Sequence, residues 1–114
     1  MRRENEGYEV CFADRALDDA EALKEYLSDE LGMPDAAQRA MEQIFHAADG
    51  LASLPLRNRV IARGKAGIEL RRALAGNYML LYITQDTCVT ILAVVHAASN
   101  VSARLKSAFE RLSV

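Results

Sequence analysis

The residues best suited to binding or acting on a partner lie in a basic stretch between positions 57 and 72. Residues 1–50 are acidic, with 13 acids against 5 basic residues and a net charge of −8, whereas residues 57–72 carry a net charge of +5. Such a patch indicates an anionic partner, either nucleic acid or an acidic polypeptide. The net charge of −2 for the whole chain disfavours nucleic acid, whose backbone needs a broad positive surface. The alternative is a solvated basic loop. The candidate partner-binding residues are Arg57, Arg59, Arg63, Lys65, Arg71 and Arg72.

Cysteine and histidine do not form a recognisable site in the sequence. Cys11 and Cys88 each lie in a strand-like run, which predicts two buried free thiols in a cytosolic protein; a disulfide or a reactive thiol is the alternative. His46 and His96 do not complete a metal-ligand spacing with them. We therefore expect no metal and no cofactor, and we expect His46 to be an ordinary surface residue of a helix.

Four further side chains could take part in acid–base or phosphate chemistry. Arg71 and Arg72 must point to opposite faces of a strand, so we expect one to pair with an acid of the helices and the other to lie on an open face. Tyr82 shares a strand face with Tyr78, and we expect it to be a core residue with a hydrogen-bonded hydroxyl. His96 ends a strand, where a structural hydrogen bond is expected and a general base is the alternative.

A central sheet must position these residues. Tyr78–Thr84 and Val89–His96 are rich in aromatic and β-branched residues, and the Gln85-Asp86 turn between them predicts a hairpin. Ile68–Leu74 is a third strand, closed by a turn at Gly76-Asn77. The runs are almost continuously apolar, which indicates that helices cover at least one face.

Shorter strands and two helices precede this sheet. Tyr8–Phe12 is predicted as a strand, and Val60–Ala62 as an edge strand or part of an ordered loop. The first helix should begin after an N-cap at Asp14 and end at Gly32, and the second should begin at Pro34. Their apolar faces form a helical hairpin and comprise Ala16, Ala20, Leu23, Leu27 and Leu31, then Ala37, Met41, Ile44, Phe45, Ala48 and Leu51.

A third helix should follow the sheet. Its N-cap candidates are Ser99, Asn100 and Ser102. Its apolar residues are Val101, Leu105, Ala108, Phe109 and Leu112. The predicted fold is therefore α+β, in the order β-α-α-(β)-β-β-β-α, as a single domain over residues 1–114. No apolar run is long enough to span a membrane and residues 1–10 lack a secretion signal, so we expect a cytoplasmic protein.

Three motifs in this order resemble the RelE/ParE superfamily of bacterial type II toxins, also called plasmid-stabilisation proteins. LSDELGMPDAAQRAMEQIFHAADGLASLP is similar to the helical hairpin of the family, LRRALAGNYMLLYI to its central strands, and VTILAVVHAASN to its last strand. The resemblance covers roughly residues 8–100. It implies an N-terminal strand and helical hairpin packed on a small, mainly antiparallel sheet, followed by a C-terminal helix. It also implies a growth-inhibiting toxin that a cognate antitoxin wraps and neutralises.

The departures from the family pattern favour one branch. RelE-like members cut mRNA on the ribosome without a metal, using a basic cluster that includes an arginine directly after the central tyrosine. This sequence has Met79 there and Ala98 after the last strand, and neither can act as an acid, a base or a cation. We therefore expect a toxin without enzymatic activity, closer to the ParE branch, whose members poison DNA gyrase by binding.

Two alternatives stay open. One is a RelE-like mRNA endonuclease that would use Arg72, Arg71, Tyr82 and His96, and the other is a degenerate member without toxicity. The expected partners are a cognate antitoxin and, as a candidate target, DNA gyrase. The ribosome with its mRNA is a less favoured target than DNA gyrase. A homodimer is an open alternative, and we expect no membrane partner.

Overall fold

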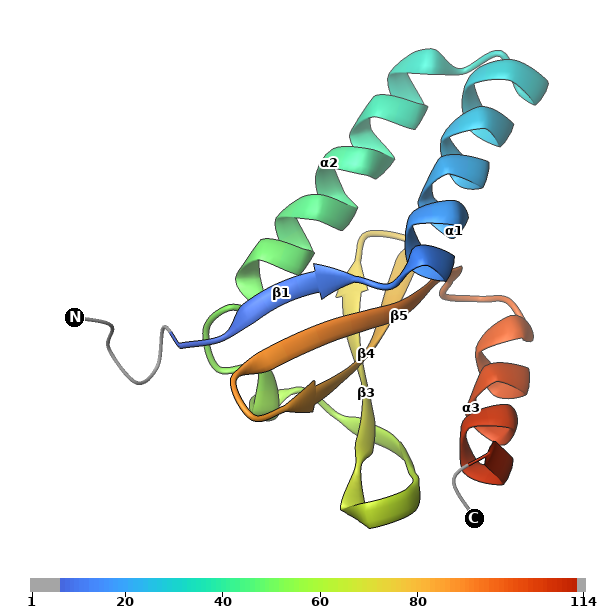
Figure 1. Cartoon of the computed structure of the whole chain (residues 1–114). Coiled ribbons are helices and arrows are strands. Elements are labelled where there is room, and N and C mark those ends of the chain that lie inside the picture. The colour runs from blue at the N-terminus through green and yellow to red at the C-terminus, as the bar shows by residue number, and fades with distance from the viewer. Residues whose placement is uncertain (1–6, 113–114) are drawn as a thin grey trace.

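Five strands form one twisted sheet in the order β1-β5-β4-β3-β2 in the computed structural model, which describes residues 7–112 (Figure 1). β1 runs parallel to β5, and every other neighbouring pair is antiparallel. The predicted strands are confirmed, and of the two alternatives for residues 60–62 the edge strand is correct. The bounds are β1 (Glu9–Phe12), β2 (Val60–Arg63), β3 (Glu69–Ala75), β4 (Tyr78–Gln85) and β5 (Cys88–His96).

The helices cover the two faces of this sheet unequally. α1 (Asp14–Glu25) and α2 (Pro34–Gly50) form an antiparallel hairpin over one face, which we call the hairpin face, and α3 (Val101–Leu112) lies over the other, the α3 face (Figure 1). Pro34 occupies the first helical position and Gly32 has a φ of 64°, as the predicted hairpin junction requires. The α+β prediction is confirmed. Within residues 7–112 no helix has the length and apolarity that a membrane crossing requires.

The hairpin face holds the larger core. Small residues of the helices, such as Ala16 and Ala48, are almost completely buried against Leu80, Tyr82 and Ile91 of the sheet. Alanine at these positions lets the helix backbones approach the strands closely. The smaller core of the α3 face contains Ala62, Leu70, Met79, Leu81, Ala93 and Val95, with Leu105 and Phe109 of α3 packed against it. The side chains of Val101, Ser102 and Leu112 lie outside the described residues.

The predicted apolar stripe of the first helix is wrong at its end. After Glu25 the chain continues as one π-helical turn, Tyr26–Glu30, before the bend at Leu31. A π turn adds a residue to the turn and rotates the following side chains away from the α-helical stripe. Leu31 is therefore 47% exposed rather than buried. Phe45 of the second helix is 42% exposed, and its ring packs on Phe12 with 5.3 Å between centroids.

Two local boundaries also differ from prediction. The N-cap of α1 is Ala13, whose carbonyl accepts from the amides of Ala16 and Leu17, and Asp14 is the first helical residue. β4 runs to Gln85, which pairs with Cys88, so the turn comprises Asp86 and Thr87 and is not Gln85-Asp86.

The cysteines are free, as expected, but they are not buried. Cys11 is exposed and Cys88 is half-buried. Val10 and Phe12 pack into the hairpin-face core, so Cys11 between them points to the other face of an edge strand. His46 is exposed on α2, as predicted.

Candidate functional site

The sheet sends Arg71 and Arg72 to opposite faces. Arg71 lies opposite Tyr82 in the β3–β4 register, and both side chains are on the hairpin face. Arg72 lies opposite Leu81 on the α3 face, and its Nη1 is 3.8 Å from the sulfur of Met79. Neighbouring arginines on one strand therefore meet different surroundings, and they cannot act on a single substrate group.

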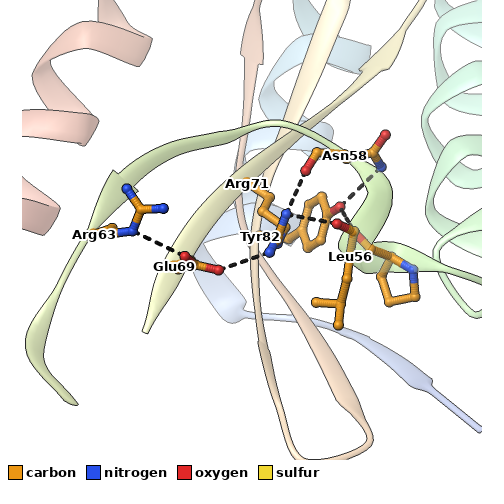
Figure 2. A network of polar contacts seen from close by, with 7 residues as sticks. Leu56, Asn58, Arg63, Glu69, Arg71 and Tyr82 are labelled. Atoms are coloured by element: carbon orange, nitrogen blue, oxygen red, sulfur yellow. Dashed lines mark hydrogen bonds and ion pairs between the residues drawn. The ribbon is translucent and has the colours of Figure 1, made fainter. Parts of the chain in front are cut away.

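Both terminal nitrogens of the Arg71 guanidinium are bound within the chain. Its Nη1 donates to the carbonyls of Leu56 at 2.9 Å and Asn58 at 2.6 Å, and its Nη2 donates to Glu69 Oε1 at 2.8 Å (Figure 2). Its side chain is only 12% exposed. The prediction of an acid partner from the helices is wrong, because residues i and i+2 of a strand share a face and Glu69 is nearer. Arg71 thus ties the segment before β2 to the sheet.

Tyr82 completes this network from the neighbouring strand. Its side chain has no exposed surface, its hydroxyl donates to the Pro55 carbonyl at 2.5 Å, and it accepts from Asn58 Nδ2 at 3.0 Å (Figure 2). Burial raises the pKa of the Tyr82 hydroxyl above 10.0, although the Asn58 hydrogen bond and the charge of Arg71 act in the opposite direction. The predicted core role with a satisfied hydroxyl is confirmed. A buried phenol of this kind is a poor base at neutral pH.

His96 lies at the end of β5, on the same face as Tyr78. The two rings meet edge to face with centroids 5.5 Å apart, and the imidazole Nδ1 accepts from the amide of Ala98 at 3.1 Å. This is the structural hydrogen bond expected from the sequence. The side chain is exposed beside a hollow of about 260 Å³ lined also by Leu23 and Tyr26.

The remaining cations of the candidate set gather around β2. Arg57, Arg59 and Lys65 are exposed, and Arg63 is 72% exposed although its Nε contacts Glu69 at 3.1 Å. Glu69 therefore lies between Arg63 and Arg71 and offsets only part of the positive charge, so the surface around β2 is cationic. Five of the six predicted partner-binding residues present charge to the solvent or to the α3 face, whereas Arg71 does not.

Sequence reasoning missed two features of this region. One is the role of Asn58, whose side-chain amide binds Tyr82 while its carbonyl binds Arg71; nothing in its local sequence marks it. The other is a group of leucines that are about half exposed or more beside the basic residues. They are Leu54, Leu56 and Leu74. In the sequence, only the isolated leucines of the segment LASLPLRNR, which stand between charged and turn-forming residues, indicate exposed apolar side chains here.

Comparison with known proteins decides the family. The family model for the ParE toxin of the type II toxin-antitoxin system, parDE, matches residues 10–101. The chain belongs to this family. The predicted membership of the RelE/ParE superfamily is thus confirmed, and the protein is a toxin of a type II toxin–antitoxin system by family. No curated protein matches the chain significantly.

Solved structures of related complexes share the fold. A chain of the chromosomal ParDE TA system from P. aeruginosa superposes with a TM-score of 0.60 at 14% identity, covering 80% of this chain and 97% of that one. The archaeal RelE-RelB complex from Pyrococcus horikoshii OT3 gives 0.52 at 21%, with coverage of 81% and 97%. The RelBE2 complex from Mycobacterium tuberculosis gives 0.53 at 30%, with coverage of 82% and 94%.

Proposed function

We propose that this ParE-family toxin acts by binding a protein, with DNA gyrase as the candidate target, and that a cognate antitoxin neutralises it by direct contact. The solved neighbours are described as toxin–antitoxin systems or complexes, and the chain spans nearly the full length of their matching chains. Binding of this kind needs an accessible surface and no reactive centre.

The separation of the candidate catalytic groups is the observation that carries this proposal. Metal-free RNA cleavage needs a base, a cation and an acid around one phosphate. Arg71 and Tyr82 are engaged with backbone and side chains on the hairpin face, and His96 lies near Tyr78 at the end of the same face. Arg72 is on the other face, beside the uncharged side chain of Met79.

The cations around β2 support the antitoxin half of the proposal. Arg57, Arg59, Arg63 and Lys65 are exposed, so they can pair with acidic residues of a partner without first breaking a buried contact. Charge complementarity of this type increases the association rate and fixes orientation more than it increases affinity. Arg71 would contribute indirectly, by holding the segment that presents Arg57 and Arg59.

Induced expression of the chain without an antitoxin tests the proposal first. Growth should stop, and purified chain should inhibit DNA supercoiling by gyrase. Primer extension on total mRNA then distinguishes binding from mRNA cleavage. It compares cells that express the wild-type chain with cells that express Arg72→Met. The binding proposal expects no codon-aligned cuts in either strain. Cuts within minutes that disappear with Arg72→Met would overturn it, since losing a catalytic cation or acid–base group typically costs about 10²–10⁴-fold in rate.

A second candidate is the RelE-like mRNA endonuclease, and the 30% identity with the RelBE2 complex chain is the observation that favours it. The same primer-extension experiment separates the two, because only the endonuclease produces cuts. Unimpeded growth at full expression would contradict both and would indicate a degenerate member retained for binding.

A further inference from the structure

A hollow of about 320 Å³ lies on the α3 face, between α3 and the sheet. Its walls are apolar side chains of the helix on one side and of three neighbouring strands on the other, and they include Leu105, Ala108, Phe109, Leu70, Leu81 and Ala93. We call this space the α3 hollow. Protein interiors are close-packed and seldom leave a void larger than a water molecule, so an unfilled apolar space of this size requires an explanation.

Small side chains and an irregular strand keep the α3 hollow open. Ala93 of β5 and Ala108 of α3 line it, and alanine at both positions leaves space that larger side chains would fill. The extra residue of β5 lies here too, so that the consecutive residues Leu92 and Ala93 both belong to the α3 face. Bulges of this kind redirect side chains and are common beside functional sites. Leu105 and Phe109 consequently stay only half-buried.

Arg15 is the one charged residue that lines the α3 hollow. Its side chain is 58% exposed, which places the guanidinium at the rim. Its Nε lies 3.9 Å from Asp19 Oδ2, and that oxygen also accepts from the Val94 amide at 3.0 Å. Across residues 7–112 no other ion pair involves Arg15. An exposed pair at this distance is weak, so both terminal nitrogens of Arg15 are available to a ligand.

The chemistry of the α3 hollow specifies an amphipathic anion. Apolar walls favour an alkyl chain, and the planar guanidinium of Arg15 matches a carboxylate with two parallel hydrogen bonds. The volume sets the length of the chain. An apolar cavity of about 150 Å³ can hold benzene, so roughly twice that volume corresponds to a chain of roughly eight to twelve carbons.

We propose that the α3 hollow binds a medium-chain fatty acid. Its carboxylate pairs with Arg15 at the rim, and its alkyl chain lies between α3 and the central strands, against Leu81 and Phe109. The bound chain would fill the space that Ala93 and Ala108 leave and hold α3 more firmly on the sheet. This site is independent of the proposed function, because it requires neither a toxic activity nor a protein partner.

Methyl NMR of the ¹³C-labelled full chain tests the site with sodium decanoate, below its micelle-forming concentration. We expect saturable shifts of the Leu81, Ala93 and Leu105 methyl groups. From hexanoate to decanoate, each added methylene should tighten binding by about fourfold, and the gain should end once the hollow is full.

Two further probes separate the chain from the charge. Decyltrimethylammonium, with the same chain and the opposite charge, should bind roughly tenfold or more weakly. Equal binding of the cation, a gain that continues to long chains, or shifts centred elsewhere would overturn the proposal. Shifts that appear with phosphatidylglycerol vesicles but not with decanoate would also overturn it, since they would assign the surface to a membrane.

Matched variants locate the site. Ala108→Leu fills the α3 hollow from the helix and should weaken decanoate binding roughly tenfold or more, whereas Ala103→Leu, at an exposed position of α3, should bind like wild type. Arg15→Met should weaken decanoate binding without changing the affinity for decanol, and Arg39→Met, at an exposed arginine of α2, is its control.

Wild-type affinity for decanoate in both Ala108→Leu and Arg15→Met would overturn the site. Arg15 is exposed, so its variant should fold and keeps the test valid even if Ala108→Leu does not fold. A chain that arrests growth without binding decanoate would contradict the α3 hollow and leave the toxin proposal standing. A chain that binds decanoate without arresting growth would do the reverse.

Discussion

The two faces of the sheet use neighbouring residues of one strand in opposite ways. On the hairpin face, both terminal nitrogens of Arg71 and the hydroxyl of Tyr82 bind specific partners, and the core around them is closed by two helices. On the α3 face, the Arg72 guanidinium lies 3.8 Å from the sulfur of Met79, and Leu74 is 60% exposed. The hairpin face is therefore closed around these two residues, whereas β3 on the α3 face leaves surface available for a partner at Arg72 and Leu74. The comparison predicts that mutations will cost stability at the closed positions of the hairpin face and not at the open positions Arg72 and Leu74.

Leu80→Ala against Leu74→Ala should give the largest contrast. Leu80 is completely buried in the hairpin-face core, so its truncation should lower the free energy of unfolding by about 2–5 kcal/mol. Leu74→Ala, at an exposed position, should change it by less than about 0.5 kcal/mol. Urea denaturation of the full chain measures both. Equal losses would mean that Leu74 is packed as tightly as Leu80, and that the contrast between the two positions is wrong.

Arg71→Met and Arg72→Met form the next pair. Loss of Arg71 removes three hydrogen bonds and leaves Glu69 without its closest cation, so we expect a loss of about 2–3 kcal/mol in the free energy of unfolding. Arg72→Met should stay within about 0.5 kcal/mol, because the Arg72 contact to Met79 is weak. Urea denaturation measures both variants. A large loss of unfolding free energy for Arg72→Met, or none for Arg71→Met, would contradict the difference between the two arginines.

This difference between the arginines could not be predicted from the sequence. The central strands are nearly continuous apolar runs, so their periodicity fixes the presence of strands and not their orientation. The register also shifts in β5: Leu81 pairs with Ala93 and Tyr82 with Ile91, which leaves Leu92 as an extra residue. An extra residue reverses the alternation of all that follow it, so a sequence pattern cannot assign faces across it.

Features set by local chemistry were predictable. Pro34 at the start of α2, Gly32 at the hairpin junction and the Gly76-Asn77 turn each follow from the backbone preferences of one or two residues. The π turn after Glu25 has no such signal, and it displaced Leu31 from the expected stripe. The basic stretch of the candidate site was predicted from the sequence. Which of its cations are structural and which are exposed was not, because Arg71 is held by the carbonyls of Leu56 and Asn58, and these approach it only in the folded chain.

Gly76→Ala tests how closely the β3–β4 turn is fitted to the hairpin face. Gly76 has φ 63°, and a Cβ there would collide with the Gln43 side-chain amide of α2. Gln43 is exposed and flexible enough to move, so the left-handed backbone should dominate the cost, about 1–2 kcal/mol in the free energy of unfolding. The double variant with Gln43→Ala should recover only a small part. Full recovery would show that the α2 contact, and not the backbone, requires glycine.

Tyr82→Phe gives the smallest expected effect at neutral pH and the most specific one. Loss of the hydroxyl removes the bond to the Pro55 carbonyl and the acceptor of Asn58, so the free energy of unfolding should fall by about 1 kcal/mol. Tyr26→Phe, at a half-exposed ring, is the control and should be neutral.

The pH dependence then identifies the buried phenol as the cause. Because burial raises the pKa of Tyr82 in the folded state, the folded chain holds this proton more tightly than the unfolded chain does. That contribution to stability is complete below pH 10.0, the ordinary pKa of the phenol, and is lost as the pH rises through the higher folded pKa. The deficit of Tyr82→Phe relative to wild type should therefore shrink at alkaline pH in urea titrations. Parallel curves for the two proteins above pH 10 would show that Tyr82 ionises in the folded chain as freely as in the unfolded one, and that the hairpin face is not closed around it.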